Sequence, residues 1–535
     1  MVFFLRGMNV DKNRINLDEF FSDDYEEDSE EYGYEDYEEY LEDDIYADHD
    51  EYDGVEVYGG EDSIDGLTRP KGKAQAPAGR SVPGMAPAAR QPAAESVGES
   101  GADTGTPAVP QDELPEPPKG DGKTFPEVPK PVMEIIDILK EHTYTSYLVG
   151  DCVNMLILGE RVMDFDIACS AAIERIIAIF EDRFKVREDL LERGELIIIN
   201  GAMGISVAPY RSRIDGSGKP IYCKTIDEDL HRRTFTSEAV AYNPDAGIYD
   251  KFGGLGCITE EKTILRAIDE EQYERLEFEQ ARIKKKSKEL PKKIVIPALR
   301  DNPECIMTAM LKFARGEAEM SPFTLRNIND NAELIDMIMP AEITRYFRRI
   351  IMGRRITETL MNFREVVFRI FPILREQYGF EQKSDYQEYT LYEHTAKAVG
   401  YAIPDYTVRL ALLLHAIGKP DCAADRGDYM TFYGHAERGA MLADDVFRDY
   451  EAEESIIDRV KFMILHHDDH ISPENLTEFT GFFGAENTRQ LLLFQSANIR
   501  AKGSDPVNER VSSTLRQLAD GLSGSNQTRF AGRRQ

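Results

Sequence analysis

The sequence predicts an α+β protein in which a small α/β head is followed by an all-helical region and preceded by an acidic tail. Strand and helix periodicities alternate over residues 131–260, helical periodicity dominates beyond about residue 261, and residues 1–65 lack a periodic apolar pattern. The predicted segments are an acidic Tyr-rich tail (1–65), a linker rich in Pro, Ala and Gly (66–130), the head (131–260), a helical neck (261–375), a second helical domain (376–510) and a polar C-terminal tail (511–535).

The acidic tail dominates the charge of the chain. The net charge is −34, and residues 1–65 hold 25 acidic side chains against 3 basic ones, so this segment contributes 22 of the negative charges. Acidic residues alternate there with tyrosines, without aliphatic residues at a helical or strand period, so we expect disorder. The linker composition over residues 66–130 predicts an extended connection, and the folded protein should begin near Pro131.

The remaining composition excludes several classes of protein. The six cysteines form no CxxC pair, which argues against a disulfide framework and a structural zinc site. Val2–Leu5 is too short for the apolar core of a signal peptide, and no run approaches the roughly 18 apolar residues of a membrane helix. We therefore expect a cytoplasmic protein with no membrane partner. There is also no phosphate-binding loop of the form GxxxxGK[ST].

The stretch YLVGDCVNMLILGERVMDFDIACSA, residues 147–171, carries the strongest functional signal. Residues 146–150 predict a strand that ends at a glycine, and residues 153–158 predict a short apolar helix that Gly159 terminates. Asp164 and Asp166 follow in a second short strand, where they alternate with the apolar Phe165 and Ile167. Residues i and i+2 of a strand share a face, so both carboxylates should point the same way.

Two carboxylates on one strand face can hold divalent metal against a nucleoside triphosphate, which is the chemistry of phosphoryl or nucleotidyl transfer. A bare DxD pair also occurs by chance on exposed strands. The context of the pair favours the functional interpretation, because a glycine turn and a helix start immediately precede it.

The same stretch resembles the signature of class II tRNA nucleotidyltransferases and bacterial poly(A) polymerases, whose usual form is VGGxVRDxLLG followed by DxD. Downstream, DLHRRTFTSEAVAYNP (229–244) is similar to the family's DLxRRDFTxNAxAYNP, and IYDKFGG (248–254) to its IDPFGG turn, before an ILRA segment. The resemblance covers roughly residues 140–320. It implies a polymerase-β-like nucleotidyltransferase head with a helical neck and body.

Several functional positions depart from the family pattern. The second glycine of VGG is Asp151, and the Arg and Asp of VRD are Asn154 and Met155. In the second motif, Thr234 replaces an aspartate and Glu238 an asparagine. The base-reading motif EDxxRxxR aligns with Asp301, Asn302, Cys305 and Thr308, and a third carboxylate, which many relatives supply from the next strand, would fall near Ser206.

The resemblance implies a template-independent transferase that adds nucleotides to a tRNA or tRNA-like 3′ end. Asp164 and Asp166 would hold two Mg²⁺ ions, Gly150 would admit the phosphates, and Arg232 and Arg233 would bind the nucleotide, ATP or CTP. Loss of the base-reading residues predicts altered nucleotide selectivity. The alternative is a catalytically inactive RNA-binding or regulatory protein of the same fold.

Two basic clusters follow the head. Residues 282–293 (RIKKKSKELPKK) include Lys284, Lys285 and Lys286, and residues 345–355 (RYFRRIIMGRR) include Arg348 and Arg349 on a predicted helix. Clustered cations release counterions from a nucleic-acid backbone, so both predict RNA contacts. A solvated loop and an exposed helix face are the alternatives.

Six of the nine histidines lie between residues 394 and 470. The contexts LYEHTAKA, LALLLHAIGKP and FYGHAERGA resemble an HD-type metal-dependent phosphohydrolase module, in which a His-Asp pair binds metal. Here His415 is followed by Ala416. The resemblance therefore implies a degenerate HD-like domain in which His394, His415 and His435 bind a metal weakly, without phosphohydrolase activity.

Overall fold

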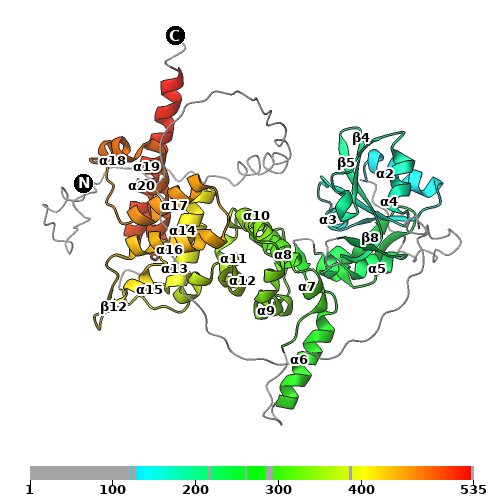
Figure 1. Ribbon diagram of the computed structural model, residues 1–535, viewed down its shortest axis with the longest axis horizontal. Coiled ribbons are helices and arrows are strands. Elements are labelled where there is room, and N and C mark those ends of the chain that lie inside the picture. Colours follow the sequence, from blue (N-terminus) through cyan, green and yellow to red (C-terminus); the bar gives the residue numbers. More distant parts are fainter. Residues whose placement is uncertain are drawn as a thin grey trace, which may run out of the picture. The chain divides into compact units, whose positions relative to one another are not determined.

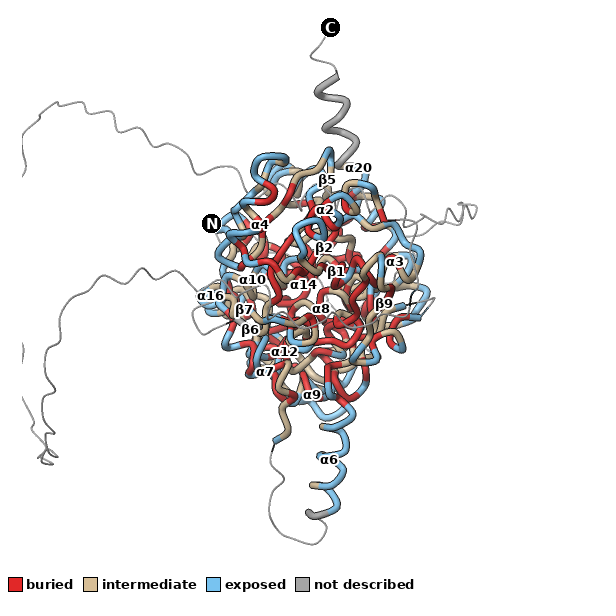
Figure 2. The backbone as a smooth tube through the Cα atoms, turned by 90° about the vertical axis from the view of Figure 1, so that its right-hand side faces the viewer, coloured by how far each residue is buried: buried red, intermediate tan, exposed pale blue. Residues whose placement is uncertain are grey.

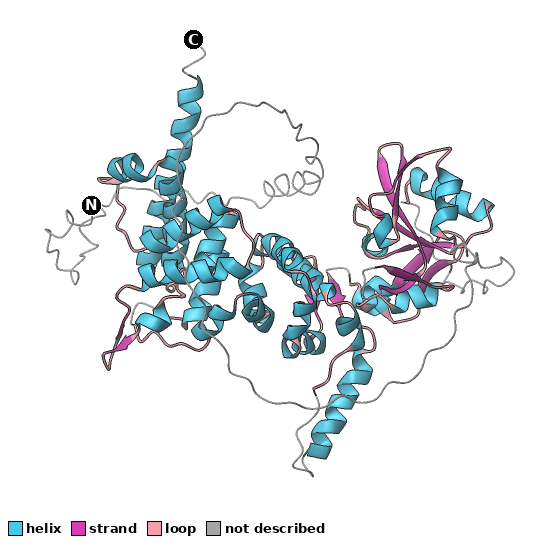
Figure 3. Ribbon diagram, viewed as in Figure 1, coloured by secondary structure: helices cyan, strands magenta, loops and turns pink. Residues whose placement is uncertain are grey.

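The computed structural model describes residues 122, 128–214, 219–259, 262–284, 293–384 and 388–531. The predictions for the acidic tail and for most of the linker fall outside these residues. The head begins with α2 (Lys130–Glu141), close to the start predicted from the sequence. Figure 3 shows the strands gathered largely in this head, with helices following.

A seven-stranded sheet forms the head, in the order β3-β4-β5-β2-β1-β8-β9. β2 and β5 pair in parallel, whereas the other neighbours in this sheet are antiparallel. The predicted sequence of strand, glycine, helix and strand is confirmed. The strands are β1 (Ser146–Val149), β2 (Phe165–Cys169), β3 (Lys185–Arg187), β4 (Leu196–Asn200), β5 (Met203–Pro209), β8 (Val240–Asn243) and β9 (Gly247–Asp250).

Figure 1 shows helices around the sheet of the head, and each face of the sheet buries its own core. On one face, Phe165 and Ile167 of β2 pack in a cluster with α2, with α3 (Asp151–Leu158) and with α4 (Ile173–Phe180). On the other face, Ala168 packs with Leu230 of α5 (Ile226–His231). Because side chains alternate along a strand, Asp166 lies on the α5 face. The sheet therefore directs the carboxylate toward the helix that precedes Arg232 and Arg233.

A second, larger core joins the helices that follow the head. It runs from Phe235 and Leu265 through the neck to Leu515 and Ala519, across the predicted boundary at residue 375. The neck helices are α6 (Glu270–Lys284), α7 (Pro297–Asp301), α8 (Glu304–Arg315), α9 (Pro322–Asp330), α10 (Pro340–Ile351), α11 (Ile356–Asn362) and α12 (Arg364–Ile370). Figure 2 shows α6 largely exposed, in contrast to the buried strands of the head.

The C-terminal helices are α13 (Leu391–Tyr401), α14 (Tyr406–Leu414), α15 (Lys419–Cys422), α16 (His435–Asp449), α17 (Glu454–His466), α18 (Leu476–Phe483), α19 (Ala485–Arg500) and α20 (Pro506–Ala531). The polar tail predicted for residues 511–535 is helical as far as Ala531. The reason is an apolar stripe at helical spacing, in which Leu515 and Ala519 are buried.

Short strands and 3₁₀ turns complete the described elements. Beyond residue 261, strands interrupt the predicted helical pattern: β10 pairs in parallel with β11, and β12 is antiparallel to β13. Among the described residues, no helix is both long and apolar enough to span a membrane. The short strands are β6 (Arg211–Ile214), β7 (Pro220–Tyr222), β10 (Thr263–Leu265), β11 (Ala318–Met320), β12 (Ala424–Asp425) and β13 (Met430–Thr431), and the 3₁₀ turns include η5 (Thr236–Ala239).

Candidate active site

Gly150 forms the whole connection between β1 and α3. Its φ of 78° lies in the region that glycine adopts without strain. A Cβ atom built at this position would lie 3.4 Å from an Nη atom of Arg233 and 3.6 Å from a carboxylate oxygen of Asp166. Three residues that were predicted from distant motifs therefore meet at one point. The missing side chain leaves room between a carboxylate and a guanidinium.

The two predicted carboxylates, Asp164 and Asp166, occupy different positions relative to β2. Asp166 lies within β2, whereas Asp164 is exposed and immediately precedes the strand. The carboxylate of Asp166 faces solvent on one side and protein on the other. Desolvation by these protein atoms, followed by the negative charge of Glu195, raises the pKa of Asp166 to about 6 despite the nearby Arg233. A cation bound next to Asp166 would therefore stabilise its ionised carboxylate.

Glu195 is a carboxylate that the sequence patterns did not reveal. β2 and β5 place Asp166 beside Ser206, the position where the family resemblance suggested a third carboxylate. The Ser206 hydroxyl donates a hydrogen bond to Glu195, which immediately precedes β4. The carboxylate of Glu195 thus lies beside Ser206, because β4 and β5 are adjacent strands. No sequence spacing marks this contact.

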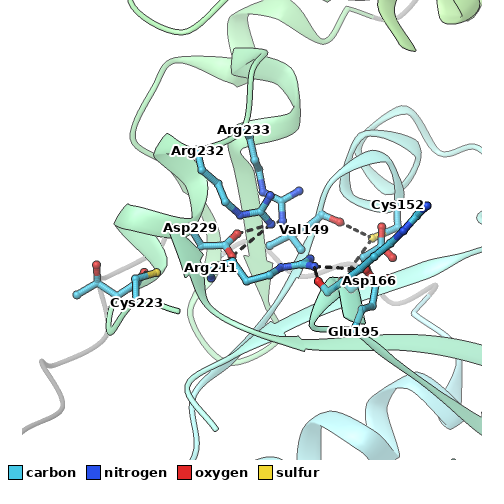
Figure 4. A network of polar contacts seen from close by, with 11 residues as sticks. Val149, Cys152, Asp166, Glu195, Arg211, Cys223, Asp229, Arg232 and Arg233 are labelled. Atoms are coloured by element: carbon cyan, nitrogen blue, oxygen red, sulfur yellow. Dashed lines mark hydrogen bonds and ion pairs between the residues drawn. The ribbon is translucent and has the colours of Figure 1, made fainter. Parts of the chain in front are cut away.

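Three arginines surround the buried Asp229 of α5. Its carboxylate accepts hydrogen bonds from the Arg211 backbone N–H at 2.9 Å, from Arg233 at 3.1 Å and from Arg232 at 3.5 Å. Burial alone would raise the pKa of Asp229, but Arg233 and Arg232 hold it below its ordinary value. Figure 4 shows the guanidinium groups around this carboxylate, with Arg211 extending toward Glu195. One carboxylate therefore binds two guanidinium groups and a backbone N–H.

The arginine cluster keeps unused hydrogen-bond donors. The Nε atoms of Arg211, Arg232 and Arg233 are buried without a hydrogen-bond partner among the described residues. Burial lowers the pKa of Arg232 to about 10, so this guanidinium still carries its charge at neutral pH. Charged guanidinium groups with free N–H groups, beside Gly150 and Asp166, are suited to a polyanionic ligand such as a triphosphate.

The residues that depart from the family pattern contact one another. Lys312 of α8 donates to Asp151 at 2.7 Å and to Glu238 at 2.8 Å. Asn302 donates to the Thr234 hydroxyl at 3.4 Å. Four departures in three motifs are thus paired, two with a lysine and two with each other. These replacements maintain a connected polar structure between the head and the neck.

A family model confirms the resemblance in this part of the chain. Residues 146–266 match the model of the poly A polymerase head domain. The match covers β1, the Asp164–Asp166 pair and both arginines. Residues 146–266 of this chain are therefore similar to a poly A polymerase head domain.

Known relatives of the poly A polymerase head are CCA-adding enzymes. The chain is 33% identical to the CCA-adding enzyme of Bacillus cytotoxicus over 135 residues, which are 24% of this chain and 33% of that enzyme. It is 25% identical to the CCA-adding enzyme of Limosilactobacillus reuteri over 246 residues, 45% of this chain and 54% of that enzyme. The chain therefore spans between a third and about half the length of these relatives.

Solved structures that align with this chain include two of CCA-adding enzymes. A structure of the Bacillus stearothermophilus CCA-adding enzyme in complex with CTP aligns with a TM-score of 0.48 at 21% identity, over 74% of this chain and 83% of that one. The Thermotoga maritima CCA-adding enzyme complexed with tRNA aligns with a TM-score of 0.44 at 16% identity, over 75% of this chain and 82% of that one.

The predicted RNA-binding residues lie outside the poly A polymerase head. Lys284 is the last residue of α6, and Lys285 and Lys286 lie outside the described residues. Arg348 and Arg349 are exposed on α10, which ends at Ile351 rather than continuing to Arg355. Partial burial, together with the neighbouring Arg315 and Arg345, lowers the pKa of Arg349. This part of α10 therefore forms a basic surface.

The histidines of the C-terminal helices are grouped differently from the prediction. His394 uses both ring nitrogens, one with the Ala501 carbonyl at 3.1 Å and one with Asn498 at 2.9 Å. His435 instead lies next to His467, with their Nε2 atoms 3.0 Å apart. Asp468 lies 3.6 Å from each of these two nitrogens, and the three residues form a group able to hold a metal ion.

His415 lies beside this group. Its ring centre is 5.6 Å from that of His467, and its Nε2 is buried without a hydrogen-bond partner among the described residues. Of the three predicted ligands, the structure thus places His435 in the group and His415 next to it. His467 and Asp468 were missed, although His467 was among the six clustered histidines. Adjacent histidines in the sequence gave no signal of which one points inward.

Proposed function

We propose that this protein is a template-independent nucleotidyltransferase that adds nucleotides to the 3′ end of a tRNA or tRNA-like RNA. The observation that carries the proposal is the meeting of Gly150, Asp166 and Arg233 at one point within a poly A polymerase head. A space without a side chain, a carboxylate and a guanidinium are what a metal-bound triphosphate requires. The similarity to CCA-adding enzymes supports the choice of RNA.

The residues present suit a hard divalent cation, Mg²⁺ in this proposal. Asp164 and Asp166 offer carboxylate oxygens. Desolvation, followed by the negative charge of Glu195, raises the pKa of Asp166, and a bound cation would offset both effects. When bound, Mg²⁺ would supply Lewis-acid activation of the RNA 3′-hydroxyl and neutralise charge on the departing pyrophosphate. Asp164 and Asp166 would hold the ions.

The remaining residues act on the nucleotide itself. Gly150 allows the backbone to approach the phosphates, because no Cβ atom fills the space toward Asp166. Arg232 and Arg233 stay fixed by Asp229 and direct further N–H groups toward an anion. Prearranged charge of this kind stabilises negative charge that develops on the phosphates, without reorganisation during the reaction.

Nucleotide selection should differ from ordered CCA addition. Base discrimination arises when the wrong base leaves buried polar groups unpaired. Asn302 is bonded to Thr234, and Cys305 is buried and lacks the charged fork of an arginine. We expect addition of one nucleotide type, or of several with poor discrimination, from the ATP and CTP supplied.

The test is incubation of the full chain with Mg²⁺, labelled ATP or CTP, and a tRNA that lacks its 3′ end. We expect extension of the RNA by the unmodified protein and none by the Asp164→Ala and Asp166→Ala double variant. Full incorporation by the double variant would refute the metal assignment. Clean CCA addition that terminates after three nucleotides would refute the altered selectivity.

The alternative is a catalytically inactive RNA-binding protein, which the altered motifs favour. The same experiment separates the two functions when a binding assay is added. RNA binding through the exposed Arg348 and Arg349, without incorporation of ATP or CTP, would support the inactive protein. Charge-reversed Arg348→Glu and Arg349→Glu should then weaken binding and lower its salt dependence.

We also propose that the HD-like C-terminal helices bind a divalent transition metal through His435, His467 and Asp468, with His415 adjacent. The Nδ1 atoms of these histidines face the carbonyls of Phe432, Ile464 and Leu412, at 2.8, 2.6 and 2.6 Å. Each Nδ1 must therefore carry the proton, because a carbonyl only accepts. The Nε2 lone pairs of neutral rings then face inward without a donor.

A metal ion would resolve this arrangement, and backbone carbonyls commonly orient metal-binding histidines in the same way. Imidazole ligands favour an ion such as Zn²⁺. Isothermal titration with Zn²⁺ should show one site that His435→Ala and His467→Ala remove and His394→Ala retains. Equal binding by all three variants would contradict the assignment. A single proton shared by the two Nε2 atoms is the competing explanation, and it predicts no zinc binding.

We expect no phosphohydrolase activity from this second site, because Ala416 offers no anionic ligand. The measurement is hydrolysis of a 2′,3′-cyclic phosphate with Zn²⁺ present. Hydrolysis that His415→Ala abolishes would contradict this expectation.

A further inference from the structure

Glu195 lies at the carboxylate edge of the head sheet, although no sequence motif marks it. It immediately precedes β4, and the antiparallel pairing of β4 with β5 places Ile197 opposite Ser206. The parallel pairing of β5 with β2 then places Ser206 beside Asp166. Residues side by side across a sheet point to the same face. Ser206 therefore lies between Glu195 on one side and Asp166 on the other, on the same face of the sheet.

Two donors fix the Glu195 side chain. The Ser206 hydroxyl donates to one carboxylate oxygen, and an Nη atom of Arg211 donates to the other at 3.5 Å. The same Nη atom donates to the Arg193 carbonyl at 3.0 Å, which fixes Arg211 in turn. The side chain of Glu195 is only 24% exposed. A carboxylate has about four lone-pair positions, so two donors leave the group able to bind a cation.

Ser206 occupies the position where the resemblance suggested a third carboxylate, and its hydroxyl cannot replace an anion. The contact with Glu195 provides a carboxylate from the neighbouring strand instead. We propose that Glu195 is a metal-binding carboxylate of the head and acts together with Asp164 and Asp166. This proposal rests on the proposed nucleotidyltransferase function. Three carboxylates compensate the charge of two divalent ions better than two do.

A purely structural role for Glu195 makes a different prediction. If Glu195 only holds Arg211 in place, a new carboxylate at residue 206 would not replace it, because that residue lies on β5 beside Asp166. If Glu195 contributes charge to bound metal, a carboxylate at residue 206 would restore the lost function. Ser206→Asp in a Glu195→Gln background distinguishes the two roles.

The experiment measures binding of Mn²⁺ to the full chain by electron paramagnetic resonance, without nucleotide. Every variant also carries His435→Ala and His467→Ala, so that the C-terminal group does not contribute. We expect Glu195→Gln to weaken Mn²⁺ binding about tenfold or more, and Glu195→Gln with Ser206→Asp to restore most of it. Ser206→Ala should weaken binding less than Glu195→Gln, because it loosens the ligand without removing it.

The outcomes separate this inference from the proposed function. Unchanged Mn²⁺ binding by Glu195→Gln, together with loss of binding by Asp166→Asn, would overturn the role of Glu195 alone. Unchanged binding by Asp166→Asn would overturn the proposed metal site itself. Weakened binding by Glu195→Gln that Ser206→Asp leaves unrestored would show that Glu195 only positions Arg211, which also overturns the inference. Thermal unfolding of each variant verifies that it is folded.

Discussion

The head site and the C-terminal histidine group depart in the same way from the sequence patterns that they resemble, with different structural consequences. Each lacks a carboxylate at the position that its family resemblance marks, at Ser206 and at Ala416. Each has another carboxylate nearby, Glu195 in the head and Asp468 among the histidines. Glu195 is 24% exposed and held by two donors, whereas Asp468 is 69% exposed and lies 3.6 Å from two imidazoles.

The difference follows from how sheets and helices bring residues together. Strand register fixes which residues are neighbours, so a side chain on the next strand can occupy the same region as the one that was lost. The histidines instead lie at the ends of helices, where a carbonyl three residues earlier orients each ring. In this group the carboxylate comes from Asp468, the residue next to His467, and it remains exposed to solvent.

The largest expected effect tests whether the two sites are independent. Asp166→Asn should reduce nucleotide addition by about 10³-fold or more, because it removes a ligand of the proposed Mg²⁺ site, and should leave Zn²⁺ binding by the C-terminal helices unchanged. His467→Ala should have the opposite pattern. The measurements are RNA extension and zinc titration on the same preparations. Loss of nucleotide addition in His467→Ala would show that the sites are coupled.

The contact between head and neck should have the next largest effect. Lys312→Met leaves Glu238 and Asp151 without their shared cation, and we expect a loss of about 1–3 kcal/mol in the free energy of unfolding. The lower part of this range reflects Asp151, which is 59% exposed and can be solvated. Urea denaturation measures the change.

Two variants control for the loss of the lysine side chain itself. Lys312→Arg keeps the charge and should retain most of the stability. Lys312→Met combined with Glu238→Gln removes the partly buried anion as well and should recover part of the loss. Equal stability of Lys312→Met and the unmodified protein would show that the two contacts contribute nothing measurable.

Ala416→Asp should strengthen metal binding by the C-terminal histidine group. It adds an anionic ligand next to His415, and we expect zinc affinity to rise about tenfold, corresponding to about 1.4 kcal/mol. The matched control is Ala416→Asn, which has the same size without the charge. Equal zinc affinity of both variants would show that residue 416 does not face the metal.

The parts of this fold that follow from local patterns were predictable, and the parts that depend on contacts between strands were not. Gly150, the α3 helix and the alternation around Asp166 follow from turn chemistry and strand periodicity. Glu195 was not predictable, because its relation to Asp166 passes through two strand pairings whose register the sequence does not state. The same applies to Lys312, which contacts residues more than 70 positions earlier in the chain.

For the histidines, the sequence does not predict the direction in which each ring points. The sequence shows six histidines between residues 394 and 470, but the carbonyl contact that turns His467 inward forms at a helix end, and periodicity does not specify it. His394 has the expected position on α13, yet Asn498 and Ala501 of a distant segment occupy its nitrogens.

The smallest expected effect concerns the charge of Asp166 without metal. The pKa of this carboxyl is about 6 in the folded protein, above the ordinary value of 3.8, so the folded state holds the proton more tightly than the unfolded state. Stability from this group is present below pH 3.8 and is lost as the pH rises to about 6. The asparagine in Asp166→Asn cannot ionise, so this variant does not lose that stability as the pH rises.

In the presence of EDTA, the melting temperature of Asp166→Asn should therefore exceed that of the unmodified protein by more at pH 8 than at pH 5. The matched control is Asp137→Asn on the exposed face of α2, which makes the same chemical change away from the candidate site. Differential scanning calorimetry at the two pH values gives both differences. A melting-temperature difference that is the same at pH 5 and pH 8 would show that Asp166 is as well solvated in the folded head as in the unfolded chain. Its negative charge would then cost the metal-free protein nothing.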